Sequence, residues 1–294
     1  MEKQYKGLFT PIVTPYTPDN EINVPEIEKH VDWLLSCGVD GLIPNGSTGE
    51  SSLLTLEEKK LVCRTALEVA DGRVPVFGGA SADSTAEAIE QAKICEDLGC
   101  DGIMVMVPYY SKITQQGVYE HYKAIAESIS IPIMIYNNPA RSMLDMSVET
   151  IAELAKIQNI RYLKESGGSI NRIHKVVRAT GGTLAVMSGY DTMALEAFVS
   201  GSVGWVASSS NIVPAECKKV TDLALKGDFV AARKAYYHVL PMLEAVEESG
   251  HLCQALKYLL NAKEGRHVGV ARMPLIDMPE PMKNGLVKAY AELH

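Results

Sequence analysis

The chain has 294 residues, 47% of them hydrophobic and 22% charged, a composition typical of a globular protein with one large domain or two small ones. Its 28 Lys and Arg against 36 Asp and Glu give a net charge of −8, so we expect no nucleic acid and no membrane as partner. The N-terminus has no apolar signal core, and no run approaches the roughly 18 apolar residues of a membrane span, so we expect a cytoplasmic protein.

Strand and helix patterns alternate along the chain. The apolar spacing up to Leu35 predicts a first helix, with Asn23 as its cap and Pro25 in its first turn. Residues 35–43 and 98–104 share a short sequence motif. In it a predicted helix ends at glycine and a strand begins two or three residues later, as in the helix-to-strand loops of parallel sheets. Further helices are predicted at 56–69, 85–98, 117–128, 147–155, 170–179 and up to 199, and strands at 8–15, 38–43, 75–79, 102–107, 131–136, 160–164, 184–187 and 203–206.

Eight alternating units over about 225 residues predict an α/β fold, a closed (β/α)8 TIM barrel. An open doubly wound sheet is the weaker alternative, because no Gly-x-Gly-x-x-Gly opens the first unit. We therefore expect a catalytic barrel in residues 1–225 and a C-terminal helical extension in residues 226–294. Its helices are predicted at 229–246, with a kink at Pro241, at 252–260 and at 283–293.

The predicted strand at residues 160–164 ends on a lysine. Because strand side chains alternate, Tyr162 and Lys164 point to one face and Leu163 to the other. A lysine held among apolar groups is less readily protonated, and its neutral amine attacks carbonyl carbons. Lys164 is thus a candidate Schiff-base lysine, although a lysine closing a strand is more often an ordinary surface residue.

Polar residues also follow the other strands, where barrel enzymes carry their chemistry. They are Gly46–Glu50, Tyr109–Tyr110, Tyr136–Arg141 and Gly189–Asp191. Each alone is usually a plain turn or a packing residue. Together with Lys164 they predict a Schiff-base site for an anionic carbonyl compound. The six cysteines and seven histidines show no metal-ligand spacing, so we expect reduced thiols and no metal.

Three motifs carry a resemblance that covers the whole chain: Gly46-Ser-Thr-Gly-Glu50, Tyr136-Asn-x-Pro139 and Lys164-Glu-Ser166. They closely resemble the dihydrodipicolinate synthase / N-acetylneuraminate lyase family of class I aldolases. The resemblance implies a barrel with a helical extension, a homotetramer built from tight dimers, and no cofactor. It also implies a first step in which a lysine imine forms with pyruvate or a related 2-oxo acid.

The resemblance assigns roles residue by residue. Lys164 would be the Schiff-base nucleophile, and Tyr136 the proton donor and acceptor beside it. Ser47 and Thr48 would bind the keto-acid carboxylate and link Tyr136 to Tyr110, which in the family often reaches into the neighbouring subunit. The backbone carbonyl of Val206 would lie near the substrate.

The signals for one family member disagree. Arg141 stands where the synthase has an arginine for the carboxylate of aspartate semialdehyde, a task that suits a bidentate guanidinium. Gly189 and Asp191 are instead similar to the lyase and sugar-acid aldolases, whose Asp contacts substrate hydroxyls, although Thr192 replaces the lyase's glutamate. Residues 256–260 and 271–274 are similar to sugar-acid and hydroxyproline-pathway members, and Lys59 replaces a histidine of the synthase's lysine-feedback pocket.

On balance Arg141 favours a dihydrodipicolinate synthase-like enzyme, a lyase that joins pyruvate to aspartate semialdehyde. The enzyme alternatives are a 2-keto-3-deoxy sugar-acid aldolase or dehydratase, N-acetylneuraminate lyase, and a hydroxyproline-pathway deaminase. A non-catalytic barrel that binds a 2-oxo acid is the alternative of another class. The joint presence of Lys164, Tyr136 and Tyr110 argues against that barrel, because binding alone needs no nucleophile.

Overall fold

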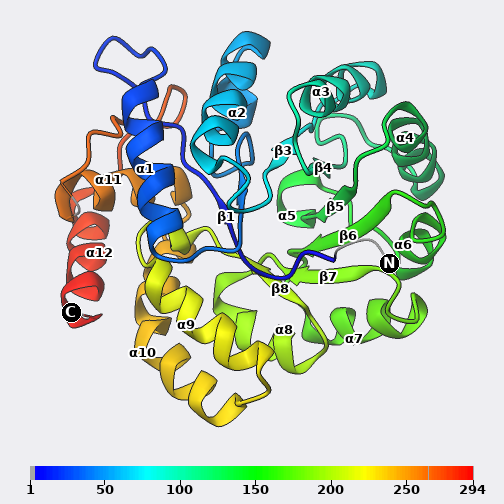
Figure 1. Cartoon of the computed structure of the whole chain (residues 1–294). Coiled ribbons are helices and arrows are strands. Elements are labelled where there is room, and N and C mark those ends of the chain that lie inside the picture. Colours follow the sequence, from blue (N-terminus) through cyan, green and yellow to red (C-terminus); the bar gives the residue numbers. More distant parts are fainter. Residues whose placement is uncertain (1–3, 264, 294) are drawn as a thin grey trace.

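The computed structural model describes residues 4–263 and 265–293. Eight parallel strands form one sheet in the order β2-β1-β8-β7-β6-β5-β4-β3, and a bridge between Leu42 and Val76 joins its two ends, so the predicted (β/α)8 barrel is confirmed (Figure 1). The strands are β1 (Gly7–Pro11), β2 (Gly41–Ile43), β3 (Phe77–Gly79), β4 (Gly102–Met106), β5 (Ile133–Asn137), β6 (Ile160–Glu165), β7 (Ala185–Ser188) and β8 (Gly204–Val206).

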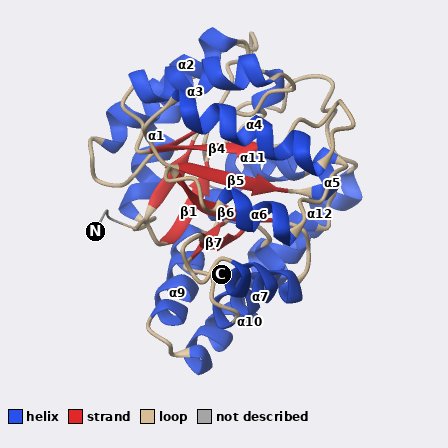
Figure 2. Cartoon of the chain, turned by 90° about the vertical axis from the view of Figure 1, so that its right-hand side faces the viewer, coloured by secondary structure: helices blue, strands red, loops and turns tan. Residues whose placement is uncertain are grey.

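Helices surround the sheet in the side view of Figure 2. The barrel helices are α1 (Val24–Ser36), α2 (Leu56–Ala70), α3 (Thr85–Asp97), α4 (Gln115–Ser128), α5 (Pro139–Ser142), α6 (Val148–Leu154), α7 (Ile170–Ala179), α8 (Ala194–Val199) and α9 (Pro214–Leu225), with 3₁₀ turns η1 (Ser51–Leu53), η2 (Asp191–Met193) and η3 (Ser209–Asn211). Helices α10 (Phe229–Glu247), α11 (Leu252–Lys263) and α12 (Glu280–Leu293) follow. The proposed division at residues 225 and 226 thus falls between α9 and α10.

Most predicted elements occur, with shifted ends. Asn23 caps α1 through its side chain, as predicted, with Pro25 in the first turn. The opening run leaves the sheet at Pro11 rather than at residue 15, because the amide of Val13 donates to Asn211 and no longer to a strand. The short helix α5 was not predicted, since four residues show no period.

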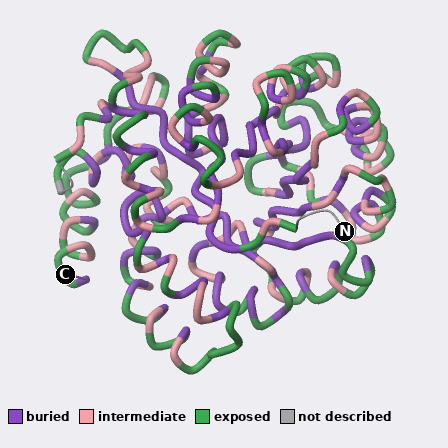
Figure 3. The backbone as a smooth tube through the Cα atoms, in the orientation of Figure 1, coloured by how far each residue is buried: buried purple, intermediate pink, exposed green. Residues whose placement is uncertain are grey.

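The barrel has an apolar interior and an outer apolar layer under the helices. In Figure 3 the backbone at the centre of the barrel is mostly coloured as buried. Tyr162 lies in the interior cluster with Tyr136 and Met187, whereas Leu163 packs in the outer layer. The alternation predicted for β6 is therefore confirmed. It directs Lys164, two residues beyond Tyr162, toward the interior at the carboxyl end of the strand.

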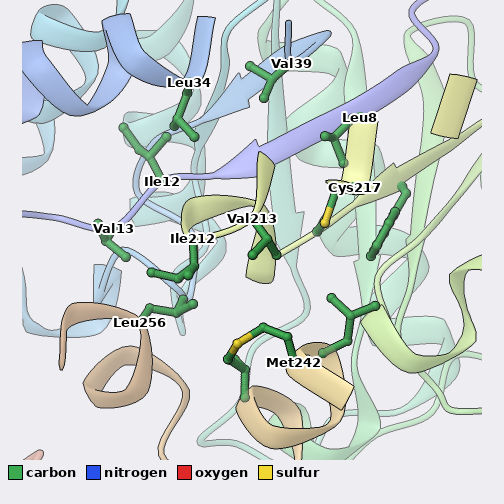
Figure 4. Close-up of a cluster of buried hydrophobic side chains, with 14 of the residues drawn as sticks. Leu8, Ile12, Val13, Leu34, Val39, Ile212, Val213, Cys217, Met242 and Leu256 are labelled. Atoms are coloured by element: carbon green, nitrogen blue, oxygen red, sulfur yellow. The ribbon is translucent and has the colours of Figure 1, made fainter. Parts of the chain in front are cut away.

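The C-terminal helices share a core with the barrel. Figure 4 shows Met242 of α10 and Leu256 of α11 in one cluster with Ile212, Val213 and Cys217. Helix α10 continues through Pro241 and packs along α9. Among the helices of the described residues, none combines the length and apolar character needed to cross a bilayer.

Three cysteines that are far apart in the sequence meet in the outer layer. The sulfur atoms of Cys63, Cys95 and Cys100 lie within 4.8 Å of one another, and those of Cys63 and Cys100 are 3.4 Å apart. All three are buried thiols. A Cβ atom at Gly78 would lie 2.5 Å from the Cys95 sulfur, so this cluster requires glycine there. Sequence spacing could not reveal the cluster, because separate helices and loops supply its members.

Buried histidine should make the fold sensitive to acid. His30, 1% exposed, places Nε2 2.9 Å from the Asn211 Oδ1, and burial lowers its pKa to about 4. Between about pH 6.5 and 4 the unfolded chain takes up a proton there and the folded chain does not, so stability falls as the pH falls. This lowering of the His30 pKa corresponds to a loss of about 3 kcal/mol in the free energy of unfolding.

The variant His30→Gln should therefore lose less stability than the wild type between pH 7.5 and 4.5, measured by urea unfolding. His121, whose pKa burial also lowers to about 4, should account for part of the remaining loss. The exposed His238→Gln serves as the control and should follow the wild type. A His30→Gln curve parallel to the wild type would contradict this account.

Candidate active site

A cavity of about 370 Å³ opens at the carboxyl ends of the strands. Side chains from the ends of β5, β6 and β7 and from the loops after β2 and β8 meet the C-terminal end of α10 there. The lining residues are Ser47, Thr48, Tyr136, Asn138, Ala140, Arg141, Lys164, Ser166, Gly189, Tyr190, Asp191, Ser208, Glu247, Gly250 and Leu252. The fold thus gathers seven of the nine predicted site residues around one space.

Lys164 and Tyr136 form the centre of the cavity. They are register partners in β6 and β5, and the Lys164 Nζ lies 4.1 Å from the centroid of the Tyr136 ring. Both side chains are buried. A Cβ atom at Gly189 would lie 2.8 Å from the Lys164 Cε, so only glycine at this position leaves room for the lysine. Gly189 therefore provides the space that the Lys164 side chain occupies.

The surroundings of Tyr136 suit proton transfer. Burial raises the pKa of its phenol, but the positive charges of Lys164 and Arg141 and hydrogen bonds from Asn138 and Ser47 outweigh burial, and the pKa is lowered overall. The Asn138 Nδ2 donates to the phenol oxygen over 2.9 Å. A phenol with a lowered pKa exchanges protons more readily near neutral pH. No role is predicted from the sequence for Asn138, although it lies within the Tyr136-Asn-x-Pro139 motif.

The loop after β2 presents Ser47 and Thr48 to the cavity. The Thr48 Oγ1 lies 3.1 Å from the Ser208 Oγ, which links this loop to the one after β8. The loop ends at Glu50, whose φ of 58° is left-handed and costly for a residue with a side chain. Ion pairing of Glu50 with Lys257 holds that conformation.

Glu165, next to Lys164, does not line the cavity and instead forms hydrogen bonds at the ends of the strands. Its carboxylate accepts bonds from the Arg172 Nε at 2.9 Å, the Asn137 Nδ2 at 3.0 Å and the Gly167 amide at 2.7 Å. These bonds tie the ends of β5 and β6 to α7. They stabilise the backbone that carries Lys164 and Tyr136, a function the sequence analysis did not assign.

Asp191 lies in the cavity wall, and each of its carboxylate oxygens accepts a hydrogen bond from the protein. Its Oδ1 accepts from the Trp205 Nε1 at 2.9 Å and its Oδ2 from the Ser209 amide at 2.8 Å. Burial raises the pKa of the carboxyl. In this structure Asp191 joins η2 to the β8 loop, while its expected contact with substrate hydroxyls stays a prediction.

Of Arg141, Tyr110 and Val206, only Arg141 is among the residues that line the cavity. Arg141 reaches the cavity from α5, whose start is capped by the Asn138 side chain. Tyr110 is 88% exposed in the loop after β4 and is not among the lining residues. Val206 is buried in the barrel interior and is not among the lining residues. The roles of all three residues stay predictions.

Glu247 and Ser166 also line the cavity, although neither is predicted as a site residue from the sequence. Ser166 belongs to the quoted Lys164-Glu-Ser166 motif, which was a usable signal. Glu247 comes from α10, far from the strands in sequence, and only the packing of the extension brings it here. No sequence pattern marked it.

A buried lysine beside a tyrosine at the mouth of a (β/α)8 barrel, with an arginine in the same cavity, defines the class of Schiff-base aldolases. The model of the dihydrodipicolinate synthetase family matches residues 4–293. The 4-hydroxy-tetrahydrodipicolinate synthase of Rhizobium meliloti is 38% identical over 97% of this chain and 97% of its own length. That of Methanocaldococcus jannaschii is 34% identical, over 98% and 99%.

Solved structures agree with this match. A chloride-inhibited dihydrodipicolinate synthase from Acinetobacter baumannii, complexed with pyruvate, superposes with a TM-score of 0.95 at 32% identity and 99% coverage of each chain. The enzyme from Aquifex aeolicus gives a TM-score of 0.94 at 31% identity and 98% coverage of each. The chain belongs to the dihydrodipicolinate synthetase family and is a lyase of the Schiff-base aldolase class.

Proposed function

We propose that the chain has 4-hydroxy-tetrahydrodipicolinate synthase activity and joins two small molecules, pyruvate and aspartate semialdehyde. The observation that carries the proposal is that Arg141 and Lys164 line one cavity. The lysine can hold the first substrate as an imine, and the guanidinium can bind the carboxylate of the second through paired hydrogen bonds. The names of the curated relatives support the same reaction.

In the first half of the reaction the Lys164 amine attacks the keto carbon of pyruvate. Tyr136 passes a proton to the departing oxygen, and water leaves as the imine forms. Ser47 and Thr48 hold the carboxylate with hydroxyl and amide groups. The cationic imine then draws electrons from the neighbouring carbon, whose proton moves to the Tyr136 oxygen and leaves an enamine.

In the second half the enamine carbon attacks the aldehyde carbon of the second substrate. The aldehyde oxygen takes the proton held by Tyr136, and the imine is regenerated. The substrate's ammonium group gives one proton to the Tyr136 phenolate, and the free amine that results attacks the imine carbon. A second proton passes from this nitrogen to the Lys164 nitrogen, the ring closes, and the Lys164 amine is released. The proton from the pyruvate carbon ends on the former aldehyde oxygen, Tyr136 and Lys164 regain their starting protonation, and the reaction requires no oxidant or reductant.

The proposal is tested with pyruvate and sodium borohydride, followed by peptide mass spectrometry and an assay with aspartate semialdehyde. A reduced pyruvate adduct on the peptide of Lys164, together with consumption of aspartate semialdehyde, would support it. An adduct with turnover of a 2-keto-3-deoxy sugar acid alone would replace it with the sugar-acid alternative. Pyruvate binding without any adduct would favour the non-catalytic barrel.

Removing Arg141 should separate the two substrates. In Arg141→Ala we expect kcat/KM for aspartate semialdehyde to fall on the order of 100-fold, because hydrogen bonds to charged groups contribute about 1.5–3 kcal/mol. Imine formation with pyruvate, followed by borohydride trapping, should stay within about threefold of wild type. The exposed Arg73→Ala is the control. Equal damage to both steps would remove the role of Arg141 in binding the second substrate.

We also propose a homotetramer of tight dimers and a cytoplasmic location. The exposed ring of Tyr110 supports the assembly. In the proposed tetramer this ring reaches into a neighbouring subunit and completes a proton relay with the Ser47 and Thr48 hydroxyls there. The net charge of −8 fits a protein without nucleic-acid or membrane partners.

A further inference from the structure

We infer that Glu247 binds the ammonium group of the second substrate, so that the cavity recognises an α-amino aldehyde acid and not merely an aldehyde acid. The inference rests on the proposed function and deepens it. Glu247 lines the same cavity as Lys164 and Arg141. A carboxylate and a guanidinium in one cavity offer opposite charges to the two charged groups of an amino acid.

The position of Glu247 is fixed by its neighbours. Its Oε1 accepts a bond from the Asp191 amide at 3.3 Å, and its Oε2 accepts from the Thr192 amide at 3.0 Å and the Thr192 hydroxyl at 2.6 Å. A carboxylate has about four acceptor positions. One position therefore remains for a donor that enters from the cavity.

The charge of Glu247 has no partner in the protein. Across residues 4–263 and 265–293, no lysine, arginine or histidine forms an ion pair with it. Burial, followed by the nearby Asp191, raises the pKa of its carboxyl to about 7. Lys164 and Arg141 line the same cavity but, within the described residues, neither forms an ion pair with Glu247, and the nearby phenols of Tyr190 and Tyr236 bring no positive charge. An ammonium group is the ligand that would compensate this anion, whereas a hydroxyl would leave its charge in place.

A second observation points to a ligand in this cavity. The Ser166 hydroxyl is buried and lines the cavity two residues beyond Lys164, and within the described chain its oxygen has no hydrogen-bond partner. Buried hydroxyls are normally paired. The cavity of about 370 Å³ is also within the range of about 300–1,000 Å³ found for sites of larger ligands.

The test compares aspartate semialdehyde with succinate semialdehyde, which has the same chain without the amino group. Pyruvate consumption is measured with each aldehyde for the wild type, Glu247→Gln and Glu247→Asp. Glu244→Gln, an exposed glutamate on the same helix, is the matched control. Trapping of the pyruvate imine with borohydride shows for each variant whether the site has kept its structure.

We expect the wild type and Glu244→Gln to prefer aspartate semialdehyde. Glu247→Gln should lose at least tenfold in this preference through a raised KM for that substrate, with the KM for pyruvate within twofold, and Glu247→Asp should recover part of it. An unchanged preference in Glu247→Gln would overturn the inference alone, and so would equal losses with both aldehydes. If the wild type forms the pyruvate imine but does not consume aspartate semialdehyde, the proposed function fails and the inference fails with it.

Discussion

Lys164→Ala is expected to abolish the borohydride-trapped pyruvate adduct and to lower turnover on the order of 10⁴-fold or more, as removal of a nucleophile does. No other lysine is among the described residues that line the cavity. No second amine is therefore placed to form the imine. Tyr136 and the Ser47 and Thr48 hydroxyls would remain, but they act on an intermediate that no longer forms.

The fold should survive this change. Lys164 stands at the end of its strand and lines an open cavity, so its loss creates no closed void in the barrel. Circular dichroism and thermal unfolding of Lys164→Ala should therefore match the wild type. The control is Lys175→Ala, an exposed lysine on α7 of the same βα unit, which should form the adduct normally. Wild-type turnover in Lys164→Ala, or an adduct on another lysine, would refute the mechanism.

Lys257→Met should destabilise the protein by about 3–5 kcal/mol, the cost of leaving one buried charge without its partner. The Lys257 Nζ lies 2.6 Å from the Glu50 Oε1, and the two side chains are 1% and 0% exposed. The ammonium also lies 3.8 Å from the centroid of the Tyr16 ring and donates to the Val270 carbonyl. Methionine fills similar space but supplies neither charge nor donor.

Urea unfolding measures this loss of stability. Three further variants, Lys288→Met, Glu50→Gln and a double variant, serve as its controls. Lys288→Met removes an exposed ion pair with Glu292 and should change stability by less than about 1 kcal/mol. The double variant Glu50→Gln with Lys257→Met should be less destabilised than the sum of the two single variants, because the charge left unpaired is then absent. Additive losses would show that the pair does not act as a unit.

The same pair should influence substrate binding. Glu50 ends the loop that carries Ser47 and Thr48, and its Oε2 accepts from the Arg272 amide at 2.8 Å. The C-terminal extension thus fixes the loop that binds the keto-acid carboxylate in the proposed reaction. In Lys257→Met, measured below its unfolding temperature, the KM for pyruvate should therefore rise.

Much of this molecule could be predicted from local patterns. Apolar runs bounded by glycine located the eight strands, and the alternation in Tyr162-Leu163-Lys164 placed the lysine on the interior face. Because parallel strands present their carboxyl ends at one rim, the polar residues after strands 2, 4, 5, 6 and 7 are expected to meet. Residues from four of these clusters line the cavity, whereas Tyr109 and Tyr110 after strand 4 are not among its lining residues. Strand ends were less accurate, since bonds such as that from the Val13 amide to Asn211 decide where pairing stops.

Contacts between distant segments could not be predicted in this way. The motif of Asp191 predicts a substrate ligand, which stays a prediction, but it does not indicate that Trp205 and Ser209 donate to the two oxygens of its carboxylate. Cys63, Cys95 and Cys100 show no spacing that marks a cluster, and the packing of α2 against α3 and the loop after it brings them together. Side-chain partners of this kind depend on the angles between elements, which the sequence of one element does not specify.

The sequence by itself determined the barrel, the Schiff-base chemistry and the candidate pair of Lys164 and Tyr136, because these follow from strand periodicity and from short motifs at strand ends. The tertiary structure alone decided which groups surround that pair. It brought Glu247 from α10 to the cavity and Lys257 from α11 to Glu50. The physical reason is that burial and charge pairing are properties of neighbours in space, and here the C-terminal helices supply those neighbours from beyond the barrel.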